Sequence, residues 1–227
     1  MTTLPAATGN IAGAVAADFF SVLLPGVPGA STAGEITTGV INGFLGRRLE
    51  KAREILIEEV RLGHRSLVEA GHEDEALSII ERYLRAAREG AARLNLRLMA
   101  RIVAGQAERG NLVADEFLYY ADLLASLRQE EVIVLATLYR YWTSTDVQAM
   151  PDDERKNATN QRTRDELVPA ALSSKELLLA TLGAVSRTGL VISASAWGGI
   201  VYFPSPLMDD LNRLCPLGEV LCREGAG

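Results

Sequence analysis

The stretch Asp165–Leu214 constrains the fold more than any other part of the sequence, because helix, turn and strand signals follow one another closely in it. A short helix is expected over Asp165–Leu172, and after a Ser-Ser break an apolar helix is expected over Lys175–Ser186. Leu190–Ile192 and Ile200–Phe203 are typical of two short strands. The stretch therefore predicts helices followed by a two-stranded hairpin.

Turn and cap residues support this order of elements. Trp197-Gly198-Gly199 is expected to form a tight turn between the strands, and Pro204-Ser205-Pro206 is expected to open another helix. A further helix is expected upstream, over Glu130–Trp142. Helix, turn, helix and two-stranded wing resemble the winged-helix fold. We therefore expect a mainly α fold: a helical hairpin or bundle followed by a winged-helix-like α+β unit with a two-stranded wing.

The middle of the chain is strongly helical. Apolar residues recur at helical spacing from Leu49 to Leu67, and Gly71-His72 is expected to end that helix. A second apolar stripe runs from Ala76 to about Glu108. The simplest expectation is one long antiparallel helical hairpin over residues 47–112.

The N-terminal 46 residues differ from the rest, because they carry two charges, Asp18 and Glu35, and eight glycines. The prolines and charges interrupt every window long enough to cross a membrane, so two short helices are expected, the first over Ile11–Leu24. In the second, Gly39 and Gly43 are four residues apart and share one face that allows close helix packing. A hairpin in residues 1–46 that meets lipid or mediates oligomerisation is the alternative.

Residues 113–214 are expected to form the winged-helix-like domain, followed by a tail over 215–227. The segment 143–164 is polar and mixed in charge, with few large apolar side chains. Because such a segment buries little apolar surface, we expect a flexible insertion within the domain.

No catalytic signature stands out, and no enzyme, cofactor or metal site is predicted. Gly29–Gly34 has the spacing of a phosphate-binding loop, but Glu35 occupies the position of the loop's lysine and would repel phosphate. The two cysteines, Cys215 and Cys222, do not make a disulfide framework. A cytoplasmic protein is therefore expected, with peripheral membrane association through residues 1–46 as the alternative.

The helix Lys175–Ser186 occupies the place of a DNA-reading helix but lacks its chemistry. Leu177, Leu178 and Leu179 point over a wide arc, and Lys175 is the only basic residue of the helix. From residue 143 to the end, eight basic residues stand against eleven acidic ones, a balance that disfavours duplex DNA. One side of this helix is therefore expected to be covered by another part of the chain or by a partner, and a partner interface is predicted at Leu177, Leu178, Leu179 and Trp197.

A row of arginines is the better candidate for an anion or nucleic-acid face. Arg93, Arg97 and Arg101 are spaced four residues apart, so they share one side of a helix. Such a row can meet phosphates, anionic lipid or an acidic protein surface, and it can equally pair with glutamates of a neighbouring helix.

The helical first half, the segment LLASLRQEEVIVLATL over Leu123–Leu138, and the run from Leu178 to Ile192 resemble the abortive-infection alpha proteins. The same signatures also occur in winged helices such as MarR-like regulators. The resemblance implies a bacterial or phage-associated defence protein and supplies no catalytic residues. The expected function is a non-enzymatic regulatory protein that binds a protein partner or forms a homo-oligomer. A DNA-binding transcription regulator and a membrane-perturbing effector are the alternatives.

Overall fold

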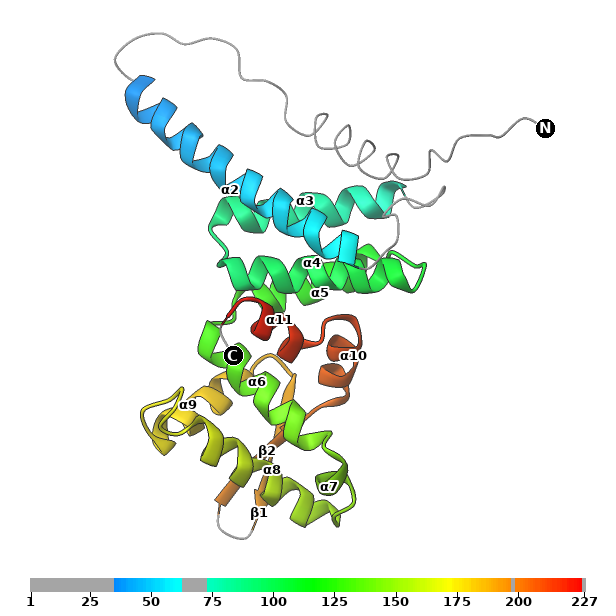
Figure 1. The fold of residues 1–227 in the computed structure, drawn as a ribbon, viewed down its shortest axis with the longest axis vertical. Helices are drawn as coiled ribbons and strands as arrows, with labels where there is room; N and C mark the ends of the chain where they lie inside the picture. Colours follow the sequence, from blue (N-terminus) through cyan, green and yellow to red (C-terminus); the bar gives the residue numbers. More distant parts are fainter. Residues whose placement is uncertain (1–34, 63–72, 197–198, 226–227) are drawn as a thin grey trace, which may run out of the picture.

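The computed structural model describes residues 35–62, 73–196 and 199–225. These residues form a helical bundle followed by a unit of helices and one two-stranded antiparallel sheet (Figure 1). The predicted fold class, mainly α with a wing-like α+β unit near the C-terminus, is therefore confirmed.

Four helices form the bundle, which is drawn in blue to green in Figure 1. They are α2 (Glu35–Leu62), α3 (Glu73–Glu89), α4 (Arg93–Glu108) and α5 (Ala114–Ala125). Helix α2 packs on α3 and α4, and both α3 and α4 pack on α5. Large side chains that are almost fully buried fill the space between them, among them Leu56, Tyr83, Leu98 and Phe117.

The bundle differs in two places from the expected helical hairpin. The second apolar stripe is divided between two helices, because α3 ends at Glu89 and Gly90 adopts a left-handed φ of 94° that a helix cannot continue. The boundary expected between residues 46 and 47 falls inside α2, which continues through it. The expected helix Ile11–Leu24 lies outside the described residues.

The second unit contains the wing-like hairpin. Its elements are α6 (Gln129–Trp142), α7 (Thr145–Gln148), α8 (Asp152–Leu167), α9 (Lys175–Ser186), β1 (Val191–Ala196) and β2 (Gly199–Pro204). The strands pair from Val191 opposite Pro204 to Ala196 opposite Gly199. The hairpin packs on α6, α8 and α9, so the expected order of helices and strands is observed.

The prediction of a flexible insertion over residues 143–164 is wrong, because α7 and most of α8 lie there. Helix α8 packs through directed polar contacts that composition does not reveal. The Asn160 side chain accepts from the Tyr202 backbone N–H at 2.9 Å and donates to the Tyr202 carbonyl at 2.7 Å. The Arg155 guanidinium lies 3.6 Å from the ring centre of Trp142. The short helix expected over Asp165–Leu172 is replaced by the end of α8 and a turn.

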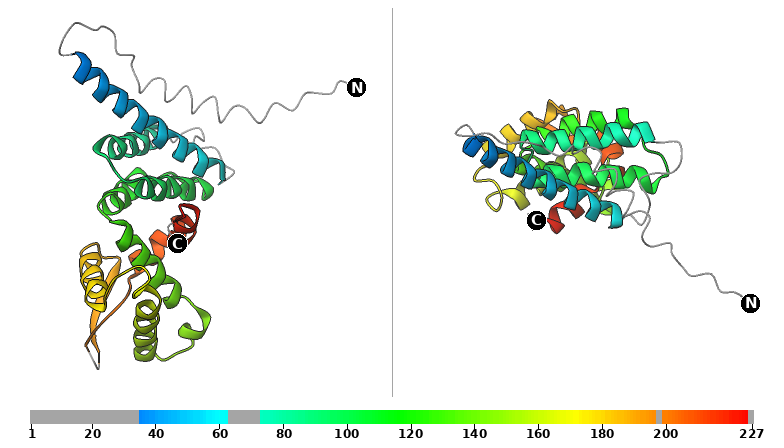
Figure 2. Two further views of the ribbon diagram at one scale, coloured as in Figure 1. Left: turned by 60° about the vertical axis from the view of Figure 1, so that its left-hand side comes forward. Right: turned by 90° about the horizontal axis from the view of Figure 1, so that it is seen from above.

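The last helices are α10 (Pro206–Leu214) and α11 (Leu217–Arg223). Helix α10 begins as predicted, with the Ser205 hydroxyl accepting from the Met208 backbone N–H. The tail expected over residues 215–227 contains helix α11, which packs on α4 and α6 and buries Leu217 and Val220. The C-terminal helices thus connect the second unit to the bundle (Figure 2).

Candidate interaction site on helix α9

The arginine row of α4 is paired with carboxylates of the same chain. The Arg97 side chain is 4% exposed, and its guanidinium contacts Glu58 at 3.0 Å, Glu59 at 2.9 Å and Glu224. Arg93 also pairs with Glu224, at 3.0 Å. Because Arg97 is enclosed by carboxylates, it has no open side to offer a phosphate.

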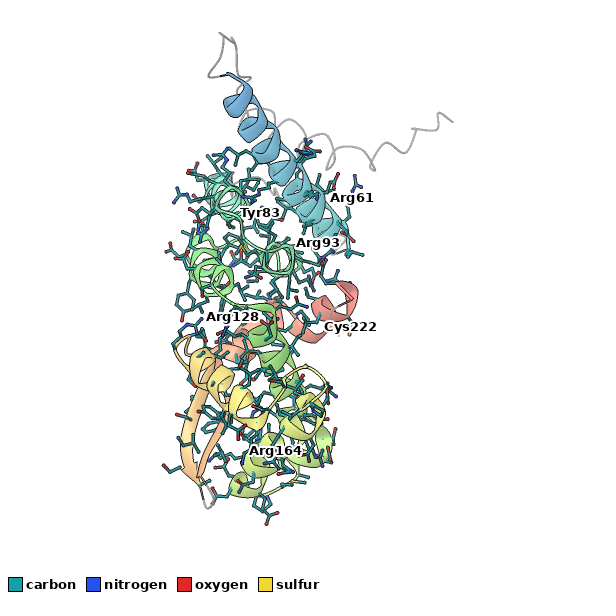
Figure 3. All side chains as sticks on the ribbon, turned by 90° about the vertical axis from the view of Figure 1, so that its left-hand side faces the viewer. Arg61, Tyr83, Arg93, Arg128, Arg164 and Cys222 are labelled. Carbon is teal, nitrogen blue, oxygen red and sulfur yellow. The ribbon has the colours of Figure 1, made fainter. Side chains whose placement is uncertain are left out.

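Three helices meet in this buried cluster of charges. Arg223 of α11 donates to both carboxylate oxygens of Glu59 of α2, at 2.8 and 2.9 Å, while Arg97 approaches from α4. Burial opposes the charge of Arg97, but the Glu58 and Glu59 carboxylates outweigh it and raise the pKa of its guanidinium. Figure 3 shows α11, marked by Cys222, against the bundle helix that carries Arg93. The cluster therefore joins the C-terminus to the bundle.

The third arginine of the row, Arg101, pairs with Glu108 at 2.7 Å. Its partner belongs to the same helix, so the row does not converge on one vacant anion site. Pairing with glutamates of a neighbouring helix, the alternative raised by the sequence, describes Arg97, which contacts Glu58 and Glu59 of α2. Arg93 pairs with Glu224, which follows α11, and Arg101 pairs within α4 itself.

Helix α9 is the other predicted site, and local signals define its ends. The Ser174 hydroxyl accepts from the Leu177 backbone N–H at 3.2 Å and caps the first turn. After Ser186 the chain turns at Gly189, whose φ of 75° is left-handed. The helix packs on α6 and on β1, and its inward face includes Leu182 and Val185.

Only one of the three consecutive leucines is covered within the chain. Leu178 is 3% exposed, whereas Leu177 and Leu179 are 44% and 40% exposed. Ala180 and Gly183 are exposed on the same side of the helix. We define the α9 face as Glu176, Leu177, Leu179, Ala180, Gly183, Ala184 and Arg187. Helix α9 lies at the outer edge of the molecule in Figures 1 and 2, and no other described element covers this face.

A groove of about 430 Å³ adjoins the α9 face, between α8, α9 and β2. The α8 wall is polar and the other walls are largely apolar. Lining side chains include Asn157, Gln161 and Arg164 on one side and Leu178, Leu179 and Ile200 on the other. Ile200 is 60% exposed, so the apolar surface of α9 continues onto the wing. Arg164 is labelled in Figure 3.

Opposite charges lie at the two ends of the α9 face. Glu176 lies in the first turn, where its own backbone N–H and the Ser174 hydroxyl lower the pKa of its carboxyl group. Arg187 follows the last turn and is held at 3.0 Å by Glu131 of α6. Burial raises the pKa of Glu131, but the Arg128 backbone N–H and Arg187 outweigh it and lower the pKa.

The remaining predicted residues are less informative. Gly39 and Gly43 lie within α2, but their surroundings are outside the described part of the structure, as is Trp197. Among described residues, no group of His, Cys, Asp and Glu is placed to hold a metal ion. Within the same residues, no helix is both long enough and apolar enough to cross a membrane.

Comparison of the chain with known protein families, curated proteins and solved structures finds no match. The site must therefore be interpreted from its own geometry. Sequence reasoning missed Ala180, Gly183 and Ile200, and it missed the α8 wall because residues 143–164 were expected to be flexible. A helical projection of Lys175–Ser186 would have found Ala180 and Gly183, because they lie on the same side of the helix as Glu176.

Proposed function

We propose that this chain is a non-enzymatic interaction protein that binds another protein through the α9 face and the adjoining groove. The observation that carries the proposal is the exposed apolar side of α9. Leu179 and Ile200, which are 40% and 60% exposed, line one groove together with polar residues of α8, and Leu177, which is 44% exposed, lies on the other side of the α9 face. Contiguous exposed apolar surface with a polar rim is typical of protein-binding sites.

Binding to duplex DNA is the rival function, and the α9 face opposes it. Helices that read bases place Arg, Lys, Asn or Gln in the middle of the exposed side. The middle of the α9 face holds Ala180 and Gly183 instead. Its basic neighbours, Lys175 and Arg187, lie at the helix ends, and Arg187 is already paired with Glu131. A defence role, implied by the resemblance to abortive-infection alpha proteins, is compatible with a protein partner and belongs to the proposal.

Site-specific photo-crosslinking in cells tests the proposal. A photoreactive amino acid at Leu179 should give discrete protein adducts, identified by mass spectrometry. The matched control is Leu77 on α3, which is also 40% exposed but lies in the bundle, far from α9 in Figure 1. Absence of any protein adduct specific to Leu179 would overturn the proposal.

Titration with fluorescent duplex DNA tests the rival directly. We expect weak binding at physiological salt, because the unit is acidic and the α9 face is apolar. Tight, sequence-selective binding that is lost in Lys175→Ala would establish a DNA-reading helix and contradict the proposed function.

A further inference from the structure

The residues of the α9 face follow a regular order along the helix. With 3.6 residues per turn, Glu176, Ala180, Gly183 and Arg187 fall in one row along the middle of the exposed side. Along the helix the row is acidic, small, small and basic. Leu177 lies beside this row, together with the half-buried Ala184.

This row is complementary to a second copy of itself that runs in the opposite direction. A two-fold axis between Ala180 and Gly183 would set Glu176 of each copy beside Arg187 of the other. It would also set Ala180 against Gly183, where small side chains let the helix axes approach closely. Leu177 of each copy would lie over Ala184 of the other. A parallel pair would instead bring like charges together at both ends.

Both charged groups are available for such a pair. The Glu176 carboxyl is exposed, and its lowered pKa keeps it ionised. The Arg187 side chain is 50% exposed, and its contacts with Glu131 and the Ala184 carbonyl both use Nη1. A guanidinium has five N–H donors, so Arg187 can donate to a second carboxylate while Glu131 holds it in place.

We infer that the α9 face binds a second copy of this chain, with the two α9 helices packed antiparallel about a two-fold axis. This inference rests on the proposed function and names its partner. The whole interface contains two Glu176–Arg187 pairs and two leucine contacts, because a two-fold axis repeats every contact. A contact centred on one helix of 12 residues is small, below about 1,200 Å², so the dimer should form in the micromolar range.

Sedimentation velocity of the full chain measures the association. The sedimentation coefficient should rise from monomer to dimer over roughly 1–200 µM, the range expected for so small an interface. Ala180→Arg places a long charged side chain at the crossing point and should weaken association at least about tenfold. Because Ala180 is exposed, the Ala180→Arg variant should keep the far-UV circular dichroism spectrum and melting temperature of the unchanged protein. Leu77→Arg, at an exposed leucine of the bundle, is the matched control and should dimerise normally.

Cysteine cross-linking tests the direction of the helices. In a Cys222→Ser background, which removes the exposed native thiol, Ala180→Cys mixed with Gly183→Cys should give a disulfide-linked heterodimer under mild oxidation. A Cβ at Gly183 meets only the Tyr202 hydroxyl at 3.8 Å, so this variant should fold. Two copies of Glu176→Cys lie roughly 16 Å apart along the helix axes in an antiparallel pair but side by side in a parallel pair, so a predominant disulfide between them would indicate parallel helices and overturn the inference.

The remaining outcomes separate this inference from the proposed function. A chain that stays monomeric over the whole range, or a dimer unaffected by Ala180→Arg, overturns the second-copy inference. If the photo-adducts at Leu179 then contain a different protein, the proposed function still stands. If no specific protein adduct forms at Leu179 either, both are overturned.

Discussion

Replacing Arg97 with methionine should destabilise the protein strongly. The change removes a guanidinium that is 4% exposed and leaves Glu59, which is fully buried, with Arg223 as its remaining cationic partner. Removing one member of a buried ion pair typically costs about 3–5 kcal/mol, because the other charge stays buried without full compensation. Since Arg223 still donates twice to Glu59, we expect a loss near the lower end, about 3 kcal/mol.

Arg93→Met provides the matched control. Arg93 lies one turn before Arg97 on α4 and pairs with the same Glu224, but its side chain is 70% exposed. Exposed ion pairs contribute about 0–1 kcal/mol, so this variant should be nearly as stable as the unchanged protein. Urea unfolding at neutral pH, followed by far-UV circular dichroism, gives the free energy of unfolding of each variant.

Equal losses below about 1 kcal/mol in the two variants would refute the reasoning. Such a result would mean that water reaches Arg97 and that the cluster contributes little. The arginine row of α4 would then again be a candidate for the anion face that its spacing predicts.

Two further predictions concern helix packing and charge. Gly105→Ala should lower the free energy of unfolding by about 1–3 kcal/mol, because the new Cβ would lie 2.3 Å from the Leu214 carbonyl oxygen. Gly46→Ala, whose Cβ would have nothing within 4 Å, should raise it by about 0.5–1 kcal/mol through helix propensity. Urea unfolding measures both changes, and a stabilised Gly105→Ala would contradict the close contact. Glu131→Gln should lower stability at pH 7, because the lowered folded-state pKa of Glu131 makes its ionised form stabilising above the unfolded value of about 4.3. That difference should shrink as the pH falls through the folded-state pKa, and a difference that stays constant down to about pH 3 would contradict it.

Helix ends and strand positions in the second unit could be predicted from short sequence signals. The helix Lys175–Ser186 has the predicted bounds, because Ser174 caps one end and Gly189 permits the left-handed turn after the other. The strands lie close to where the apolar runs predicted them: β1 begins one residue later, at Val191, and continues to Ala196, and β2 is longer by one residue at each end. Such signals act between residues close in sequence, so they do not depend on the rest of the fold.

The path of α8 could not be predicted in this way. Most of its own residues are polar, and contacts that hold it in place include those with Trp142 and Tyr202, which lie on other elements. A hydrogen bond between Asn160 and a strand edge requires that the strand already lies beside the helix. Composition therefore indicated a flexible segment where tertiary contacts form a helix.

The sequence by itself determined which residues of α4 and α9 share a helical side, because helical periodicity is a local property. It predicted the row of Arg93 and Arg97 and the excess of leucines over Leu177–Leu179. Only the tertiary structure decided which of these sides is buried. The close approach of α2 and α11 encloses Arg97 among carboxylates, and no described element approaches α9 on its outer side. Burial depends on residues far apart in the chain, so it arises only when the helices pack.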